Sequence, residues 1–193
     1  MLLVGLALVP AGWTLARLGM TGHMAGHMAL VAVAAPLIAF GITGTRADPA
    51  GRWPRLVTPM AMMLLELVTV WGWHLPAMRN LSHQLAPAMI IEQASFLVAG
   101  VLLWSAVVHA SNRAAGIGAL LLTTMHMTLL GVLIGLAPRL LYHAMPGAPF
   151  GLDPLADQQM GGAVMLAIGA GSYLAGGLAL LAGLLRREPE KVQ

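Results

Sequence analysis

Long apolar runs separated by short polar connections make up almost the whole chain. The runs lie near residues 1–16, 21–44, 56–78, 86–109, 115–141 and 157–185, and Pro, Gly and Arg residues mark the connections between them. A helix needs roughly 20 mostly apolar residues to cross a membrane. We therefore predict an all-α fold, a polytopic transmembrane helix bundle with about six spanning helices in a single integral membrane domain over residues 1–193.

Composition supports a membrane class. Hydrophobic residues make up 59% of the chain and charged residues 9%, and the mean hydropathy is +0.82, which is outside the range of soluble domains. The first apolar run has no charged residues ahead of it and no small-residue cleavage site, so we expect it to be retained as a span or uncleaved signal anchor. The lipid bilayer is therefore the main expected partner of the surface.

The positive charges are unevenly distributed between the even-numbered and the odd-numbered connections, and this distribution predicts the topology. Seven of the ten Arg and Lys residues lie in the second and fourth connections and the C-terminal tail, namely Arg46, Arg52, Arg55, Arg113, Arg186, Arg187 and Lys191. Only Arg17, Arg79 and Arg139 lie in the odd-numbered connections. By the positive-inside rule both termini are expected in the cytoplasm and the odd connections outside. Charges scattered in this way form no basic patch, so no nucleic-acid partner is expected.

Histidine and methionine gather at the outer face that this topology predicts. The second helix begins with His23, Met24, His27 and Met28, and the third ends at His74. Other residues at or near that face, able to act as second-shell or entry groups, are Glu92, Asp157, Gln158, His83, His143 and Met160.

The spacing of the first four residues predicts a ligand set on one quadrant of a helix. Residues four apart lie nearly above one another, so His23 and His27 share one stripe while Met24 and Met28 share the next. The chain has no Cys, which excludes thiolate sites and covalently attached haem. Imidazole and thioether donors suit a soft ion, so Cu(I) is favoured, and zinc bound by histidine alone stays open. The alternative is that the methionines fill the core and the histidines are interfacial side chains.

A second, weaker cluster lies near the middle of the fifth run. Met125, His126 and Met127 are consecutive, and consecutive helical residues point roughly 100° apart, so the three cannot all face one ion. His126 is either a pathway residue, a haem ligand, or a buried histidine bonded to a neighbouring helix. If the protein instead binds haem b, axial pairs would come from His27, His74 and His126.

Carboxylates inside apolar runs are costly and suggest paired or functional roles. Glu92 is close in depth to the His and Met set, whereas Glu66 lies deeper and can serve to bridge helices. Asp153 before Pro154 is typical of a helix N-cap. Asp157 complements the dipole of that helix, and a functional role for it stays open.

Several segments together resemble one family. They are "HMAGHM" at 23–28, "WHLPAM" at 73–78, "EQASFLVAGVLLW" at 92–104, "GLAPRLLYH" at 135–143 and, most specifically, "GLDPLADQQMGGAVM" at 151–165. With these motifs the chain resembles the CtaG family of polytopic membrane cytochrome c oxidase assembly factors, which is distinct from the single-span copper chaperone of the same name. In place of the Glu-His that the family pattern leads us to expect, this chain has Glu92-Gln93, which removes one expected ligand.

The resemblance implies a bacterial inner-membrane protein that handles copper during maturation of the oxidase. We expect a metallochaperone, not an enzyme, that holds Cu(I) at the periplasmic face for an oxidase subunit or another cuproprotein. A homo-oligomer remains open. The rival hypotheses are a b-type haem protein that transfers electrons and an assembly scaffold that binds no metal.

Overall fold

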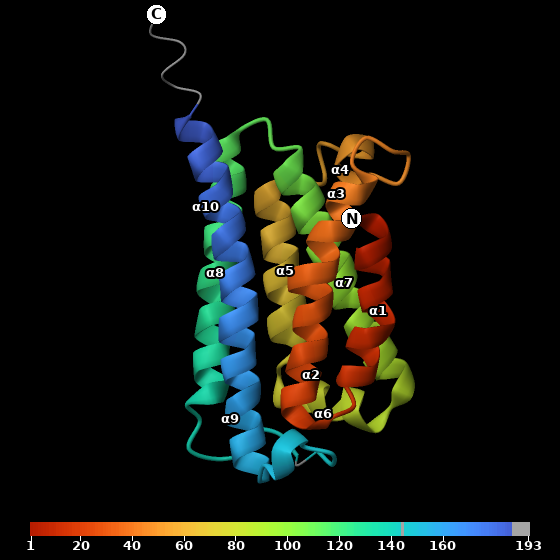
Figure 1. Ribbon diagram of the computed structural model, residues 1–193, viewed down its shortest axis with the longest axis vertical. Helices are drawn as coiled ribbons and strands as arrows, with labels where there is room; N and C mark the ends of the chain where they lie inside the picture. The colour runs from red at the N-terminus through yellow and green to blue at the C-terminus, as the bar shows by residue number, and fades with distance from the viewer. Residues whose placement is uncertain (144, 187–193) are drawn as a thin grey trace, which may run out of the picture.

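The computed structural model describes residues 1–143 and 145–186. Within these residues every regular element is helical, so the predicted all-α class is confirmed. The helices are α1 Leu2–Leu15, α2 Gly19–Met28, α3 Ala35–Ile42, α4 Pro49–Arg52, α5 Pro59–Trp73, α6 Pro76–Gln84, α7 Ala86–Val108, α8 Arg113–Gly135, α9 Pro154–Val164 and α10 Gly171–Leu185 (Figure 1). Two π-helical segments, η1 Ala29–Ala34 and η3 Met165–Ala170, and a 3-10 turn, η2 Pro149–Gly151, complete the described elements.

The described residues contain fewer helices of spanning length than the six predicted. Four continuous helices are long and apolar enough, namely Gly19–Ile42, Ala86–Val108, Arg113–Gly135 and Pro154–Leu185. Helices α5 and α6 make a fifth only when taken together, because the chain bends by 71° between them. Helix α1 has 14 residues, which at 1.5 Å per residue gives about 21 Å against a hydrocarbon core of about 30 Å.

Proline ends two helices earlier than the hydropathy pattern predicts. The helix predicted over 56–78 stops at Trp73, and Leu75 is extended (φ −62°, ψ 136°) before Pro76, as residues preceding proline prefer. The helix predicted over 115–141 ends at Gly135, shortly before Pro138. Both runs stay apolar past these points, so hydropathy alone does not locate the ends.

The helices alternate in direction, so the start of α1 and the end of α10 point to the same end of the bundle (Figure 1). We call this end the α4 end, because it carries α4 and the 109–112 connection. The opposite end, the α6 end, carries the start of α2, the whole of α6, the start of α7 and the segment 136–153. Arg187 and Lys191, which the topology prediction counts, lie outside the described residues.

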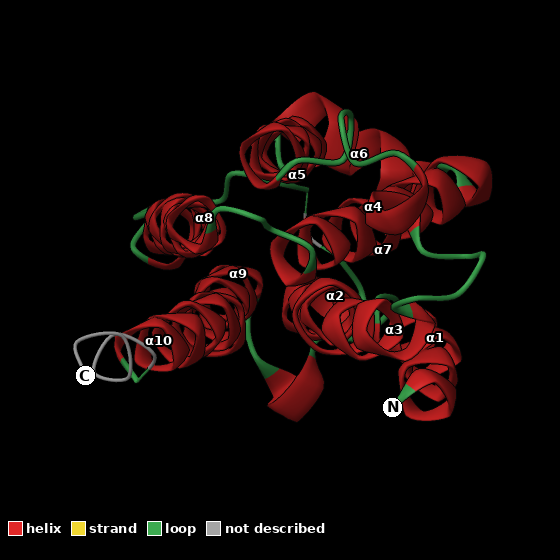
Figure 2. Cartoon of the chain, turned by 90° about the horizontal axis from the view of Figure 1, so that it is seen from above, coloured by secondary structure: helices red, strands yellow, loops and turns green. Residues whose placement is uncertain are grey.

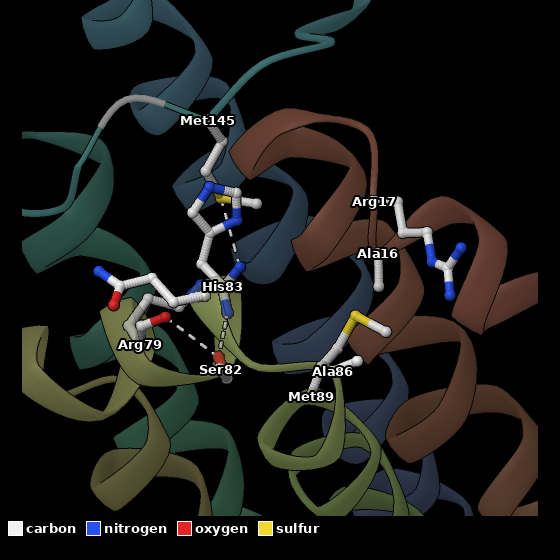
Figure 3. Close-up of a pocket in the computed structure, with 9 residues that line it drawn as sticks. Ala16, Arg17, Arg79, Ser82, His83, Ala86, Met89 and Met145 are labelled. Carbon is white, nitrogen blue, oxygen red and sulfur yellow. Dashed lines mark hydrogen bonds between the residues drawn. The ribbon is translucent and has the colours of Figure 1, made fainter.

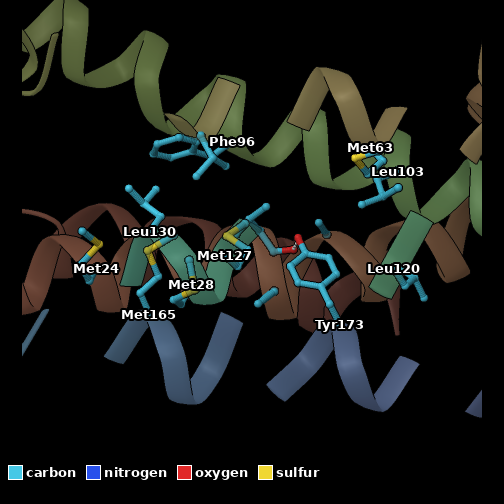
Figure 4. Close-up of a cluster of buried hydrophobic side chains, with 14 of the residues drawn as sticks. Met24, Met28, Met63, Phe96, Leu103, Leu120, Met127, Leu130, Met165 and Tyr173 are labelled. Carbon is cyan, nitrogen blue, oxygen red and sulfur yellow. Dashed lines mark hydrogen bonds between the residues drawn. The ribbon is translucent and has the colours of Figure 1, made fainter. Parts of the chain in front are cut away.

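Helix α2 lies between α1 on one side and α9 on the other, while α7 packs against α3, η1 and α5 (Figure 2). Helix α8 joins the two halves through contacts with α5, α9 and α10. A methionine-rich core fills the space between them and includes Met24, Met28, Met127 and Met165 together with Phe96 (Figure 4).

The two π-helical segments contact one another and both contact α2. A π turn shifts the regular backbone ladder, and polar side chains from a neighbouring helix satisfy carbonyls of η1. The Ser172 hydroxyl donates to the Ala32 carbonyl (2.7 Å) and the Tyr173 hydroxyl to the Val31 carbonyl (3.3 Å). Tyr173 also donates to Glu66, which therefore bridges α5 and α10 as expected for a buried carboxyl group.

The α4 end is organised around Asp48, which caps α4. Its carboxylate accepts hydrogen bonds from the Gly44 and Gly51 backbone N–H groups and the Ser105 hydroxyl, and lies 3.0 Å from the ring of His109. Burial alone raises the pKa of Asp48, but these hydrogen bonds outweigh it and hold the pKa below its usual value. His109 thus has a structural partner at the face opposite the candidate metal ligands.

Candidate metal centre

The start of α2 is fixed by a residue from a distant helix. Gly19 has φ +62°, a conformation that favours glycine, and the residue before it offers no side-chain cap. Instead Asp157 of α9 accepts hydrogen bonds from the backbone N–H groups of Met20 (2.6 Å) and Thr21 (3.0 Å). Asp157 therefore acts as the N-cap of α2 and holds the helix that carries His23 and His27.

Three buried histidines converge one to two turns into the bundle from this cap. The ring centroids of His23 and His27 on α2 are 6.5 Å apart, and His74, at the end of α5, lies 6.2 Å from the first and 5.4 Å from the second. Their exposed fractions are 1%, 0% and 4%. Phe96 of α7 stacks on His27 at 3.8 Å and closes the inner side of the cluster. We call His23, His27 and His74 the histidine triad.

Among the described residues, five of the six ring nitrogens in the triad have no hydrogen-bond partner. Both nitrogens of His23 and of His27 and the Nε2 atom of His74 are buried and unpaired. The Nδ1 atom of His74 lies 2.6 Å from the Val70 carbonyl oxygen, so a proton there leaves Nε2 with its lone pair facing the cluster. Buried polar atoms are nearly always paired in folded proteins. The described residues leave these five nitrogens without the partner that such atoms normally have.

The triad is close to metal-binding geometry without already having it. In the part of the chain that the structure describes, no group of three or more His, Cys, Asp or Glu side chains stands ready to hold an ion. A metal–nitrogen bond of about 2.0 Å places an imidazole centroid about 3.1 Å from the ion, so two rings on opposite sides of one ion are about 6.2 Å apart and three rings around one ion are about 5.4 Å apart. The separation of His27 and His74, 5.4 Å, matches a three-ligand site, whereas those of His23 from His74, 6.2 Å, and from His27, 6.5 Å, are longer. Rotation of the rings about their side-chain bonds is the change that ligation requires.

A buried ion pair, which the sequence analysis missed, adjoins the triad. Glu92 of α7 lies with Oε1 3.7 Å from His23 Nε2 and with Oε2 3.4 Å from the Nη1 atom of Arg79. Arg79 is 3% exposed and also donates to Ser82 and to the Met145 sulfur. The sequence offered Arg79 only as a loop charge, because nothing local in α6 shows that it turns inward.

Met24 and Met28 lie beside the triad and face another way. Both are fully buried, and they pack toward small residues of the last span: a Cβ on Gly161 would meet Met24 at 3.2 Å, and one on Gly169 would meet the Met28 sulfur at 2.8 Å. The roughly 100° between consecutive helical residues explains this, because the histidine stripe faces α5 and α7 while the methionine stripe faces α9 and η3. The structure does not bring the four residues to one point.

Hydrogen bonds of Gln158 and Tyr142 hold the segment after α8 against the site. Gln158 uses its amide oxygen to accept from the Leu141 N–H (2.7 Å) and its amide nitrogen to donate to the Arg139 carbonyl. The Tyr142 hydroxyl donates to the His74 carbonyl (3.0 Å). Burial raises the pKa of Tyr142 to about 12, with the Arg79 charge opposing part of that rise, so the hydroxyl keeps its proton at neutral pH. Gln158 and Tyr142 therefore position the backbone around His74.

The remaining expected residues are distributed more widely. His83 and His143 are exposed at the α6 end, and Met160 is 43% exposed on α9. The backbone N–H of His143 donates to the Asn80 side chain, which ties the segment to α6. Gln93 is buried with both amide atoms unpaired.

The three residues of the mid-span cluster lie in different surroundings, because consecutive helical residues point in different directions. Met125 is 66% exposed on the outer surface of the bundle, whereas His126 is 7% exposed and Met127 lies in the core. Both ring nitrogens of His126 are buried without a partner within residues 1–143 and 145–186, so no helix described there supplies the hydrogen bond that was one alternative for this residue.

The fold and this site define a multi-pass helical membrane protein with a buried, unpaired histidine cluster at one end of its bundle. The chain belongs to the cytochrome c oxidase caa3 assembly factor family, Caa3_CtaG, whose model matches residues 1–187. This finding confirms the resemblance on which the sequence analysis relied. No significant match exists among the curated proteins or among the solved structures.

Proposed function

We propose that the protein binds Cu(I) as cargo in the histidine triad and passes it to a cytochrome c oxidase subunit or another cuproprotein during assembly. In this proposal the α6 end faces the periplasm of a bacterial inner membrane and both termini lie in the cytoplasm. The excess of Arg and Lys in the connections and tail of the opposite end supports that orientation. The protein binds and transfers an ion and catalyses no reaction.

The observation that carries the proposal is the set of five unpaired ring nitrogens. A buried polar group without a partner costs roughly 1–3 kcal/mol, so the triad is an expensive arrangement unless a ligand completes it. Neutral imidazoles donate lone pairs to a metal and carry no charge of their own, which suits a monovalent soft ion. Glu92, 3.7 Å from His23, supplies a nearby negative charge for the ion that arrives.

The arrangement also supports release of the ion. Cu(I) is stable with two or three ligands, whereas closed zinc sites take four. His27 and His23 come from one helix and His74 from another, so a small separation of α2 from the end of α5 would remove one ligand of three.

Copper content of the detergent-purified protein tests the proposal. Wild type, His23→Ala/His27→Ala and His126→Ala are titrated with Cu(I) under anaerobic conditions against a chromogenic chelator, and absorption spectra are recorded. His126 is the matched control, because it too is buried with both ring nitrogens unpaired. We expect the double variant to lose a bound equivalent with an affinity decrease of at least about a hundredfold, or roughly 2.7 kcal/mol, and the control to retain it.

Three results would contradict the proposal. Unchanged copper binding in the double variant would remove the triad from the site. A Soret band in the purified protein would favour haem. Full oxidase maturation in cells that carry the double variant would favour a scaffold that binds no metal.

A further inference from the structure

A pocket of about 390 Å³ opens at the α6 end, between the end of α1, α6 and the start of α7 (Figure 3). Met89 reaches it from α7, Met145 from the 136–153 segment and His83 from the last turn of α6. Two thioethers and an imidazole from three separate segments therefore line one opening. These are soft, neutral donors of the kind that bind Cu(I).

The two positive charges at the pocket are each reduced in effect, one by an ion pair and one by solvent. In the part of the chain that the structure describes, no carboxylate lines it, and of the two arginines there Arg79 is paired with Glu92 at 3.4 Å. Arg17 is exposed, so water and salt screen its charge. The Met145 sulfur is held in place by the Arg79 guanidinium at 3.3 Å.

One face of α7 runs from this pocket to the histidine triad. Met89, Glu92 and Phe96 are three and four residues apart, so they lie along a single stripe of the helix. Met89 lines the pocket, Glu92 is level with His23, and Phe96 stacks on His27. The seven residue steps from Met89 to Phe96 span about 10 Å along the helix axis.

The Arg79–Glu92 pair separates the pocket from the triad. Arg79 lines the pocket and Glu92 contacts His23, so the pair occupies the boundary between the two. The Nε atom of Arg79 and the Oε1 atom of Glu92 are buried without hydrogen-bond partners. The pair is thus incompletely satisfied in this arrangement, and a cation beside Glu92 would compete with Arg79 for the carboxylate.

We propose that this pocket is a second Cu(I) site, the port through which copper enters, with Met89, Met145 and His83 as its ligands. The inference rests on the proposed function, since it gives the triad its route of supply. Copper bound at the port displaces Arg79 from Met145. The ion then moves inward along the α7 stripe as Glu92 exchanges its partner Arg79 for the ion at His23.

The test compares Met89→Leu/Met145→Leu with wild type, with His23→Ala/His27→Ala, and with Met125→Leu. Leucine has nearly the volume of methionine, so the substitutions keep the packing while removing the sulfur. Met125, 66% exposed on the outer surface, is the matched control. Cu(I) is added anaerobically to each detergent-purified protein, and its stoichiometry and its sulfur coordination are measured by chelator competition and X-ray absorption.

We expect wild type and Met125→Leu to bind two equivalents with sulfur in the coordination shell. The Met89/Met145 variant should bind one equivalent without sulfur, and the His23/His27 variant one equivalent with sulfur. Two equivalents with sulfur in the Met89/Met145 variant would overturn the port. One equivalent with nitrogen ligands alone in wild type would overturn the port and leave the triad proposal intact, whereas no copper in wild type would overturn both.

Discussion

Replacement of Asp157 by Asn should weaken the protein more than any exposed cap replacement, because Asp157 caps a helix 137 residues away in the sequence. The asparagine keeps the shape of the side chain but offers only one oxygen. Because asparagine is uncharged, one of the two N–H groups, of Met20 or Thr21, keeps only a neutral acceptor, and the other loses its acceptor in a buried place.

The magnitude follows from these contacts. A hydrogen bond to a charged group contributes about 1.5–3 kcal/mol, and the loss of negative charge at a helix start adds about 0.3–1 kcal/mol. The sum is about 2–4 kcal/mol. For a chain of this size each kcal/mol shifts the Tm by about 2–4 °C, which gives a decrease of roughly 4–16 °C.

Thermal unfolding in detergent measures the effect, and Asp153→Asn is the control. Asp153 also caps a helix through two N–H groups, those of Leu155 and Ala156, but it is exposed and local. Asparagine is an equally good cap there, so its Tm should change by less than about 2 °C. Because Asp157 positions the helix that carries His23, its variant should also bind Cu(I) about ten-fold more weakly. Equal, small Tm changes in the two variants would refute the reasoning.

Three further predictions concern Gly19, the Arg79–Glu92 pair and Tyr142. Gly19→Ala should lower the Tm, because φ is +62° and the new Cβ would lie 2.7 Å from the Asp157 carboxylate; a Tm equal to wild type would show that α2 begins differently. Glu92→Gln alone should cost about 3–5 kcal/mol by leaving Arg79 buried without a charge partner, and adding Arg79→Met should recover much of that loss; a double-mutant cycle of chemical unfolding would contradict this if the two effects simply add. Since burial raises the pKa of Tyr142 to about 12, its contribution to stability is complete below the unfolded value of about 10 and is lost as pH rises towards 12. Unfolding measured from about pH 8 to 11 should show an alkaline decline that is smaller in Tyr142→Phe, and identical profiles would exclude this role.

The sequence by itself determined the helical membrane class and the residues of the triad. Long apolar runs require helices in lipid, because a backbone there must pair its own polar groups. The four-residue spacing of His23 and His27 puts them on one stripe, which is a local property of any helix. The segment that contains Asp157, together with four other motifs, also indicated the family.

Only the tertiary structure decided what each stripe faces. Periodicity places Met24 beside His23, yet packing turns the methionines to α9 and the histidines to α5 and α7. The same holds for Asp157, whose own helix gives no sign that its carboxylate caps α2, and for Arg79, which looks like a loop charge until α6 bends inward. The physical reason is that helix periodicity is set by neighbours along the chain, whereas the partner of a helix face is set by how all the helices fit together.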